Sequence, residues 1–190
     1  MFRITTLFFA LLISGCTYCP SGTYFRHGIT QYHGDGTIRD VSQRALFFGS
    51  RGYVIEFDKF DLGSAYDKQF RLANLPTIAN SSAEICLAVE DEELSFNQID
   101  SLRKKLAAEL IISLTNSAGI AEAGLSTNIG TMRWSSPVHG YKGYWLYTEK
   151  GSFFTPRPEE TYYLRVQYSP DATLKGKHGC IYLYSGCGGS

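Results

Sequence analysis

The sequence predicts a mainly β protein, an antiparallel β-sandwich of Ig-like or C2-like topology with one short helix. Short segments in which apolar and polar residues alternate recur along the chain, and residues typical of turns separate them. Aromatic residues make up 14% of the chain, including 13 tyrosines, and such side chains favour strands. Because regular helices do not separate the strands, we expect antiparallel pairing rather than βα units.

The clearest strand is expected from Thr161 to Tyr168. Tyr162, Leu164 and Val166 share one face of it, and Ser169-Pro170-Asp171 forms a turn at its end. Residues 117–130 are small and glycine-rich, which predicts a long connection or a weak strand. Further strands are predicted at 53–58, 70–73, 85–89, 110–114, 132–134, 141–147 and 180–184.

One amphipathic helix is expected between Ser95 and Leu106. Ser95, followed three residues later by Gln98, matches a capping box at a helix N-terminus. Apolar residues then recur at helical spacing, and the basic residues lie toward the C-terminal end, where the helix dipole favours positive charge. This segment accounts for the helical part of the predicted fold.

The first sixteen residues have the layout of a secretory signal peptide. Arg3 precedes the apolar run Ile4–Ile13, and two small residues, Ser14 and Gly15, stand just before Cys16. A membrane-spanning helix needs roughly 20 apolar residues, about twice what this run provides. The segment is therefore expected to be removed rather than to anchor the chain.

The residues Ile13-Ser14-Gly15-Cys16 resemble the lipobox of bacterial lipoproteins. The resemblance implies cleavage between Gly15 and Cys16, a diacylglycerol thioether on Cys16, and acylation of the new amino terminus by a fatty acid such as palmitate. Thr17, not Asp, follows the cysteine, which implies sorting to the outer membrane with the domain facing the periplasm. The alternative is an ordinary signal peptide that happens to end near a cysteine.

If Cys16 carries lipid, four cysteines remain in an oxidising compartment, where disulfides persist. Cys86 and Cys180 fall in predicted strands, whereas Cys19 and Cys187 lie in the two tails. This placement favours a bond between Cys86 and Cys180 and another between Cys19 and Cys187, although sequence alone leaves the other pairings open. The alternative is that Cys86 is a small buried hydrophobic residue. No metal site or cofactor is expected.

Four regions are predicted: a lipoprotein signal peptide at 1–15, a tether at 16–49, a β-sandwich domain at 50–185 and a flexible tail at 186–190. The formal net charge is +0, and lysine and arginine do not cluster. A nucleic-acid partner is therefore not expected. The anticipated partners are the membrane, through the lipid on Cys16, and a protein of the envelope.

The sequence carries no recognisable catalytic motif, so an enzyme is not expected. His33 and Asp35 lie in a glycine-rich loop that resembles a solvated segment more than a metal site. The pattern favours a non-catalytic structural or adaptor role on a periplasmic or outer-membrane partner. The alternatives are a module that binds a sugar, in a groove lined by Trp134 or Trp145, a module that binds a toxin-like enzyme, and a hydrolase with a polar cleft.

Overall fold

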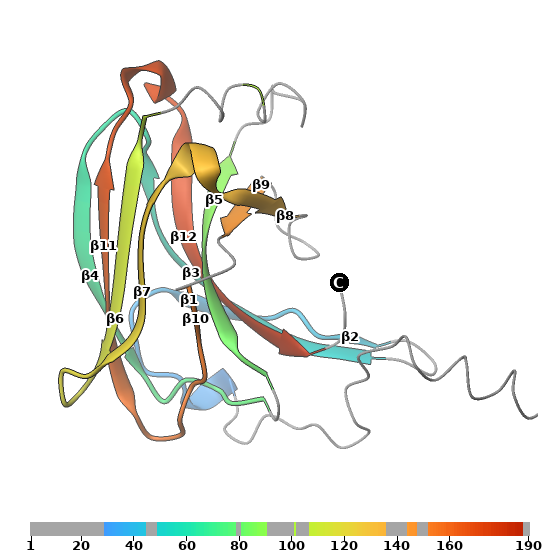
Figure 1. Cartoon of the computed structure of the whole chain (residues 1–190). Helices are drawn as coiled ribbons and strands as arrows, with labels where there is room; N and C mark the ends of the chain where they lie inside the picture. The colour runs from blue at the N-terminus through green and yellow to red at the C-terminus, as the bar shows by residue number, and fades with distance from the viewer. Residues whose placement is uncertain are drawn as a thin grey trace, which may run out of the picture.

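The computed structural model describes residues 29–44, 49–78, 81–90, 101, 107–135, 144–147 and 152–187. Within these ranges the protein is mainly β, and two antiparallel sheets face each other (Figure 1). The prediction of a β-sandwich is confirmed. None of the helices in this part of the chain has the length and apolar character needed to cross a membrane.

The larger sheet has eight strands in the order β1-β3-β12-β5-β9-β8, with β2 beside β3 and β10 beside β5. The smaller sheet has four strands in the order β4-β11-β6-β7. The strands of the larger sheet are β1 (Thr37–Asp40), β2 (Gln43–Arg44), β3 (Gly49–Asp61), β5 (Ala83–Glu90), β8 (Arg133–Ser135), β9 (Tyr144–Tyr147), β10 (Phe153–Phe154) and β12 (His178–Cys187). Those of the smaller sheet are β4 (Tyr66–Ala73), β6 (Glu109–Asn116), β7 (Ala121–Asn128) and β11 (Thr161–Ser169), and three short 3-10 helices are η1 (Ile29–Gln31), η2 (Ile129–Thr131) and η3 (Ala172–Leu174).

The chain crosses between the sheets at most connections, and its last two strands insert between earlier ones. β11 lies between β4 and β6, and β12 lies between β3 and β5. This interleaving is the arrangement of a jelly roll. It differs from the Ig-like or C2-like order that the sequence suggested, because strand order depends on pairing between distant segments, which local alternation does not encode.

The core lies between the sheets and is built from the inward residues of each strand. In β11, Tyr162, Leu164 and Val166 are fully buried, as the alternation predicted. Phe57 of the larger sheet meets Phe70 of the smaller one, with ring centroids 4.6 Å apart. Fully burying a side chain of this size contributes about 1.5–3 kcal/mol. Such contacts hold the two sheets together.

The fold begins earlier in the chain than the sequence indicated. β1 pairs antiparallel with β3, so part of the segment assigned to the tether at 16–49 belongs to the sandwich. Gly36 permits this close packing, because it has a φ of +88° and an added Cβ would lie 2.8 Å from the carbonyl oxygen of Glu56. The tether prediction therefore has to be shortened by residues 29–44.

Several predictions fall on parts of the chain that the structure does not describe. The signal peptide, the lipobox with Gly15 and Cys16, and Cys19 lie outside the described residues. So does the helix expected at 95–106, apart from Ser101, which is helical. At the other end β12 runs to Cys187, so the first two residues of the predicted tail at 186–190 belong to a strand.

Candidate functional site

At one edge of the smaller sheet, the C-terminal end of β4 is covered by the loop that precedes β1. The backbone N–H of His33 donates to the carbonyl oxygen of Ala73 at 3.0 Å, and that of Asp35 donates to the carbonyl oxygen of Arg71 at 2.8 Å. The backbone N–H of Arg71 donates in turn to the Asp35 carboxylate at 2.7 Å. The loop thus acts as an extra strand. His33 and Asp35 have a structural role in sealing this edge.

The opposite edge of the same sheet is β7, which pairs only with β6 within the described residues. The N–H of Ile129, just past β7, donates to the carbonyl oxygen of Ala108 at 2.9 Å. Hydrogen-bonded and non-hydrogen-bonded residue pairs alternate along antiparallel strands. The backbone N–H and C=O groups of Leu125 therefore point toward β6, as the N–H of Ile129 does. Gly124 and Ser126 therefore direct their backbone N–H and C=O groups away from the sheet, and both residues are exposed.

β7 has few of the features that usually protect a sheet edge, namely one register shift near Ala121 and one acid, Glu122. It is eight residues long and contains no lysine, arginine or proline. Gly124 has no side chain and Ser126 has a small one. A Cβ added to Gly124 would have its nearest neighbour 4.0 Å away. At Gly124 and Ser126, no large or charged side chain of β7 itself would meet another strand that approaches this edge.

Three exposed apolar side chains lie around the same strand, at different positions along it and on different faces of the sandwich. Ile111, Ile120 and Phe153 are 39%, 62% and 40% exposed, and they are the exposed large hydrophobic residues among those described. Ile111 lies opposite Ser126 of β7, Ile120 immediately precedes β7, and Phe153 belongs to β10, which contacts β7. We call β7 together with these three side chains the β7 edge surface.

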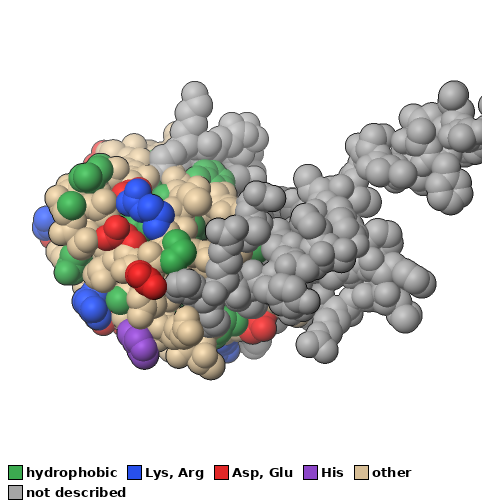
Figure 2. Space-filling view, turned by 90° about the horizontal axis from the view of Figure 1, so that it is seen from below, with side chains coloured by type: hydrophobic (Ala, Val, Ile, Leu, Met, Phe, Trp, Pro, Cys, Tyr) green, Lys and Arg blue, Asp and Glu red, His purple; other side chains and the backbone are tan. Residues whose placement is uncertain are grey.

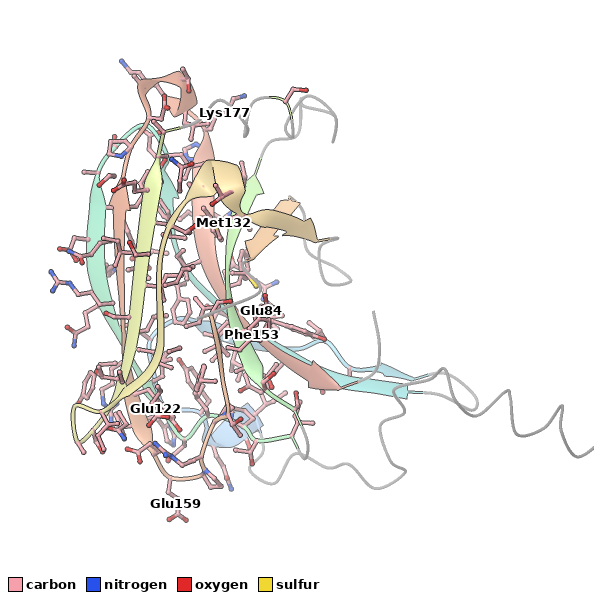
Figure 3. The ribbon with its side chains drawn as sticks, in the orientation of Figure 1. Glu84, Glu122, Met132, Phe153, Glu159 and Lys177 are labelled. Carbon is pink, nitrogen blue, oxygen red and sulfur yellow. The ribbon has the colours of Figure 1, made fainter. Side chains whose placement is uncertain are left out.

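Hydrogen bonds at the start of β7 hold the turn that carries Ile120. The Asn116 side-chain oxygen accepts from the N–H of Ile120 at 2.9 Å, and its Nδ2 donates to Glu122 at 3.0 Å. Arg157 forms an ion pair with Glu122, the one charged residue of β7. Figure 3 shows Glu122 at the end of the sandwich near this turn. The turn is thus fixed, and the charge of Glu122 has a partner.

A half-buried acid lies next to the β7 edge surface. Glu84 of β5 is directly opposite Phe153 on one side and Tyr184 on the other, and Figure 3 shows Glu84 and Phe153 close together. Among the residues that the structure describes, its buried Oε1 has no hydrogen-bond partner. Burial raises the pKa of Glu84 to about 7. This carboxyl group therefore changes charge near neutral pH.

The cysteines do not form the bond that the sequence favoured. Cys86 and Cys180 are both buried, and neither is part of a disulfide. Cys86 lies opposite Tyr182 and Cys180 opposite Ala88, so the two thiols are diagonal rather than direct neighbours across β5 and β12. Diagonal positions are about 7–8 Å apart, beyond the usual Cα separation of a disulfide. Burial also raises the pKa of the Cys86 thiol well above its ordinary value. The second predicted bond, between Cys19 and Cys187, involves side chains outside the described part.

The remaining candidate residues do not form a binding centre in the described part of the chain. β8 and β9 pair, with Trp134 opposite Leu146 and Trp145 opposite Ser135, but the side chains of both tryptophans lie outside the described residues. No group of three or more histidine, cysteine or acidic side chains that could hold a metal occurs among those described. The described surface in Figure 2 mixes acidic, basic and apolar side chains without a field of one sign.

Sequence reasoning missed the β7 edge surface because its strand has no strong alternation. The usable signals were negative ones, namely the absence of lysine, arginine and proline across residues 121–128. The exposed Ile120 stands out only when the turn that presents it is known.

Comparisons with known proteins identify no family. No protein family matches the chain, and no curated protein matches it. Among solved structures, an arabinose-bound α-L-arabinofuranosidase is similar over 85% of this chain and 24% of its own, with 12% sequence identity and a TM-score of 0.27. The chain thus spans about a quarter of that protein's length. A likeness this weak carries no argument about function.

Proposed function

We propose that the protein is a lipid-anchored envelope protein of bacteria with a non-catalytic structural or adaptor role. It docks its β-sandwich onto a periplasmic or outer-membrane protein through the β7 edge surface. The observation that carries the proposal is the open edge of β7 at Gly124 and Ser126, with exposed apolar side chains around it at Ile111, Ile120 and Phe153. An adaptor needs such a surface, whereas catalysis does not.

The energetics favour a protein contact at this surface. Fully burying an isoleucine or phenylalanine side chain contributes about 1.5–3 kcal/mol, and part of that gain is still available at Ile120 and Phe153. An open strand edge is a typical site for the addition of another strand, and exposed apolar side chains near it add area that a partner can bury. The same sheet seals its other edge at Asp35 and Arg71, so the open edge is not a general property of the fold.

The anchor is the second part of the proposal and depends on the lipobox resemblance at Cys16. A lipoprotein cysteine carries several acyl chains, and each buried methylene contributes about 0.8 kcal/mol, which is enough for stable attachment. Attachment to the outer membrane would concentrate the domain in the layer where its partner is expected.

Site-specific photocrosslinking in intact envelopes tests the docking role. A photoreactive residue placed at Ile120 or Phe153 is expected to yield one discrete crosslinked envelope protein. The control is the same residue at Gln69, which is exposed on β4 at the other side of the sheet. Equal products at Gln69 and Ile120, or no product at either docking position, would overturn the proposal.

A further inference from the structure

We propose that the strand seated on the β7 edge is β7 of a second copy of this chain, paired antiparallel about a two-fold axis at Leu125. This inference rests on the β7 edge surface of the proposed function and names the partner of its backbone. The side chains of Ile120 and Phe153 stay accessible for contact with the envelope protein. The result is a symmetric dimer in which the two smaller sheets join into one.

The backbone groups of β7 select this register. Gly124 and Ser126 carry the outward N–H and C=O groups, so a reciprocal pair must bring Gly124 of one copy opposite Ser126 of the other. That arrangement forms four hydrogen bonds, two on each side of the axis. A shift that centres the axis on Ser126 would require Asn128, whose carbonyl oxygen already accepts from Thr131 at 2.8 Å.

A shift in the other direction, centred on Gly124, is also disfavoured. It would place Ser126 opposite Glu122, where the register between β6 and β7 is interrupted near Ala121 and Ala123. The pairing of Gly124 with Ser126 uses only groups in the regular part of β7. It is therefore the register that leaves the rest of the strand unchanged.

The side chains of β7 are compatible with pairing to themselves. Leu125 of one copy faces Leu125 of the other, and these partly buried side chains already pack against the core. Ala123 faces Thr127, and Gly124 faces Ser126, so no large side chains meet on the outer face. Glu122 approaches Asn128 rather than another acid. β7 has small residues on both sides of one leucine, so two antiparallel copies of it can pair without a clash between large side chains.

A single cysteine at the axis tests the register. Residues opposite each other in a non-hydrogen-bonded pair have Cα atoms about 4.5 Å apart, which suits a disulfide. Leu125→Cys in the full chain is therefore expected to give a crosslinked dimer on mild oxidation. In the control Ala123→Cys, the two new cysteines are four residues out of register, roughly 14 Å apart along the strand. It should give no more dimer than the unmodified chain.

A second pair of variants tests the backbone contact without touching the fold. Ser126→Pro removes an outward N–H that β6 does not use, so the thermal unfolding midpoint should change little while the dimer is lost. Ser126→Ala keeps the N–H and should remain dimeric. Native mass spectrometry of the full chain counts the copies directly, and it separates a true dimer from two lipidated chains in one micelle.

The outcomes separate this inference from the proposed function. A monomeric full chain, or equal crosslinking of Leu125→Cys and Ala123→Cys, overturns the self-pairing. If photocrosslinking at Ile120 still captures an envelope protein in that case, the docking role stands. A dimer that shows the Leu125→Cys crosslink but captures no envelope protein supports self-pairing and refutes docking.

Discussion

The buried carboxyl group of Glu84 should make the stability of the fold depend on pH near neutrality. Within the described part of the chain its Oε1 has no hydrogen-bond partner, and burial raises its pKa from the ordinary 4.5 to about 7. The folded state therefore prefers the protonated, neutral acid.

The sign and size of the effect follow from linkage between folding and protonation. An acid whose pKa is higher in the folded state releases its proton more readily on unfolding, so stability is highest below pH 4.5 and falls as pH rises toward 7. The difference between about 7 and 4.5 corresponds, at 1.36 kcal/mol per pH unit, to about 3 kcal/mol. Partial contact with solvent makes this an upper limit.

Denaturant unfolding at about pH 5 and about pH 8 measures this effect. The unmodified chain should lose up to about 2.5 kcal/mol of unfolding free energy between the two conditions, whereas Glu84→Gln should lose markedly less. Glu109→Gln serves as the control, because Glu109 is exposed on β6. If Glu84→Gln and the unmodified chain show the same change with pH, the account of Glu84 is refuted.

Three further predictions concern the anchor, the thiols and one turn. Cys16→Ala should abolish incorporation of labelled lipid, and unchanged labelling would contradict the lipobox assignment. An alkylating reagent should leave Cys86 and Cys180 unmodified in the native protein and label both after unfolding, because both are buried; fast native labelling would refute that burial. Gly36→Ala should cost about 1–3 kcal/mol in denaturant unfolding. Gly176→Ala shares a positive φ but has nothing within 4 Å, so it should cost less, and an equal loss would show that the close contact at Gly36 is unimportant.

The sequence predicted the strands that alternate strongly, because alternation is a local signal. The strand expected at Thr161–Tyr168 is observed as β11, Thr161–Ser169, and its inward residues are the ones predicted. The strand expected at 85–89 is observed within β5. In these segments the core requires large apolar residues at every second position, so the pattern and the structure have the same cause.

Strand order and the packed N-terminal segment could not be predicted, because they depend on contacts between distant residues. The insertion of β12 between β3 and β5 joins parts of the chain more than a hundred residues apart. The packing of His33 and Asp35 on β4 likewise arises from backbone hydrogen bonds to Ala73 and Arg71. Backbone hydrogen bonds do not depend on side-chain hydropathy, so the hydropathy pattern does not predict them. The glycines around Asp35 suggested a loop, but they did not indicate that this loop packs against β4.

The candidate site escaped prediction for a related physical reason. An open edge is defined by the neighbour that is missing, so it becomes visible only when every strand has been placed. β7 was expected as a long connection or weak strand, since alanine, glycine and serine carry little hydropathy signal. The same small side chains are what allow another strand to approach Gly124 and Ser126.

The two edges of the smaller sheet differ, because the N-terminal segment contacts only one of them. Residues 33–35, which lead from the N-terminal part of the chain, lie along β4, whereas β7 is the opposite edge, three strand spacings or about 14 Å away. A chain anchored through Cys16 would thus enter the fold at the sealed edge. The open edge, with Leu125 and Ser126, lies at the opposite side of the smaller sheet. The described chain that follows the proposed anchor therefore contacts the edge of this sheet that the proposed docking strand does not use.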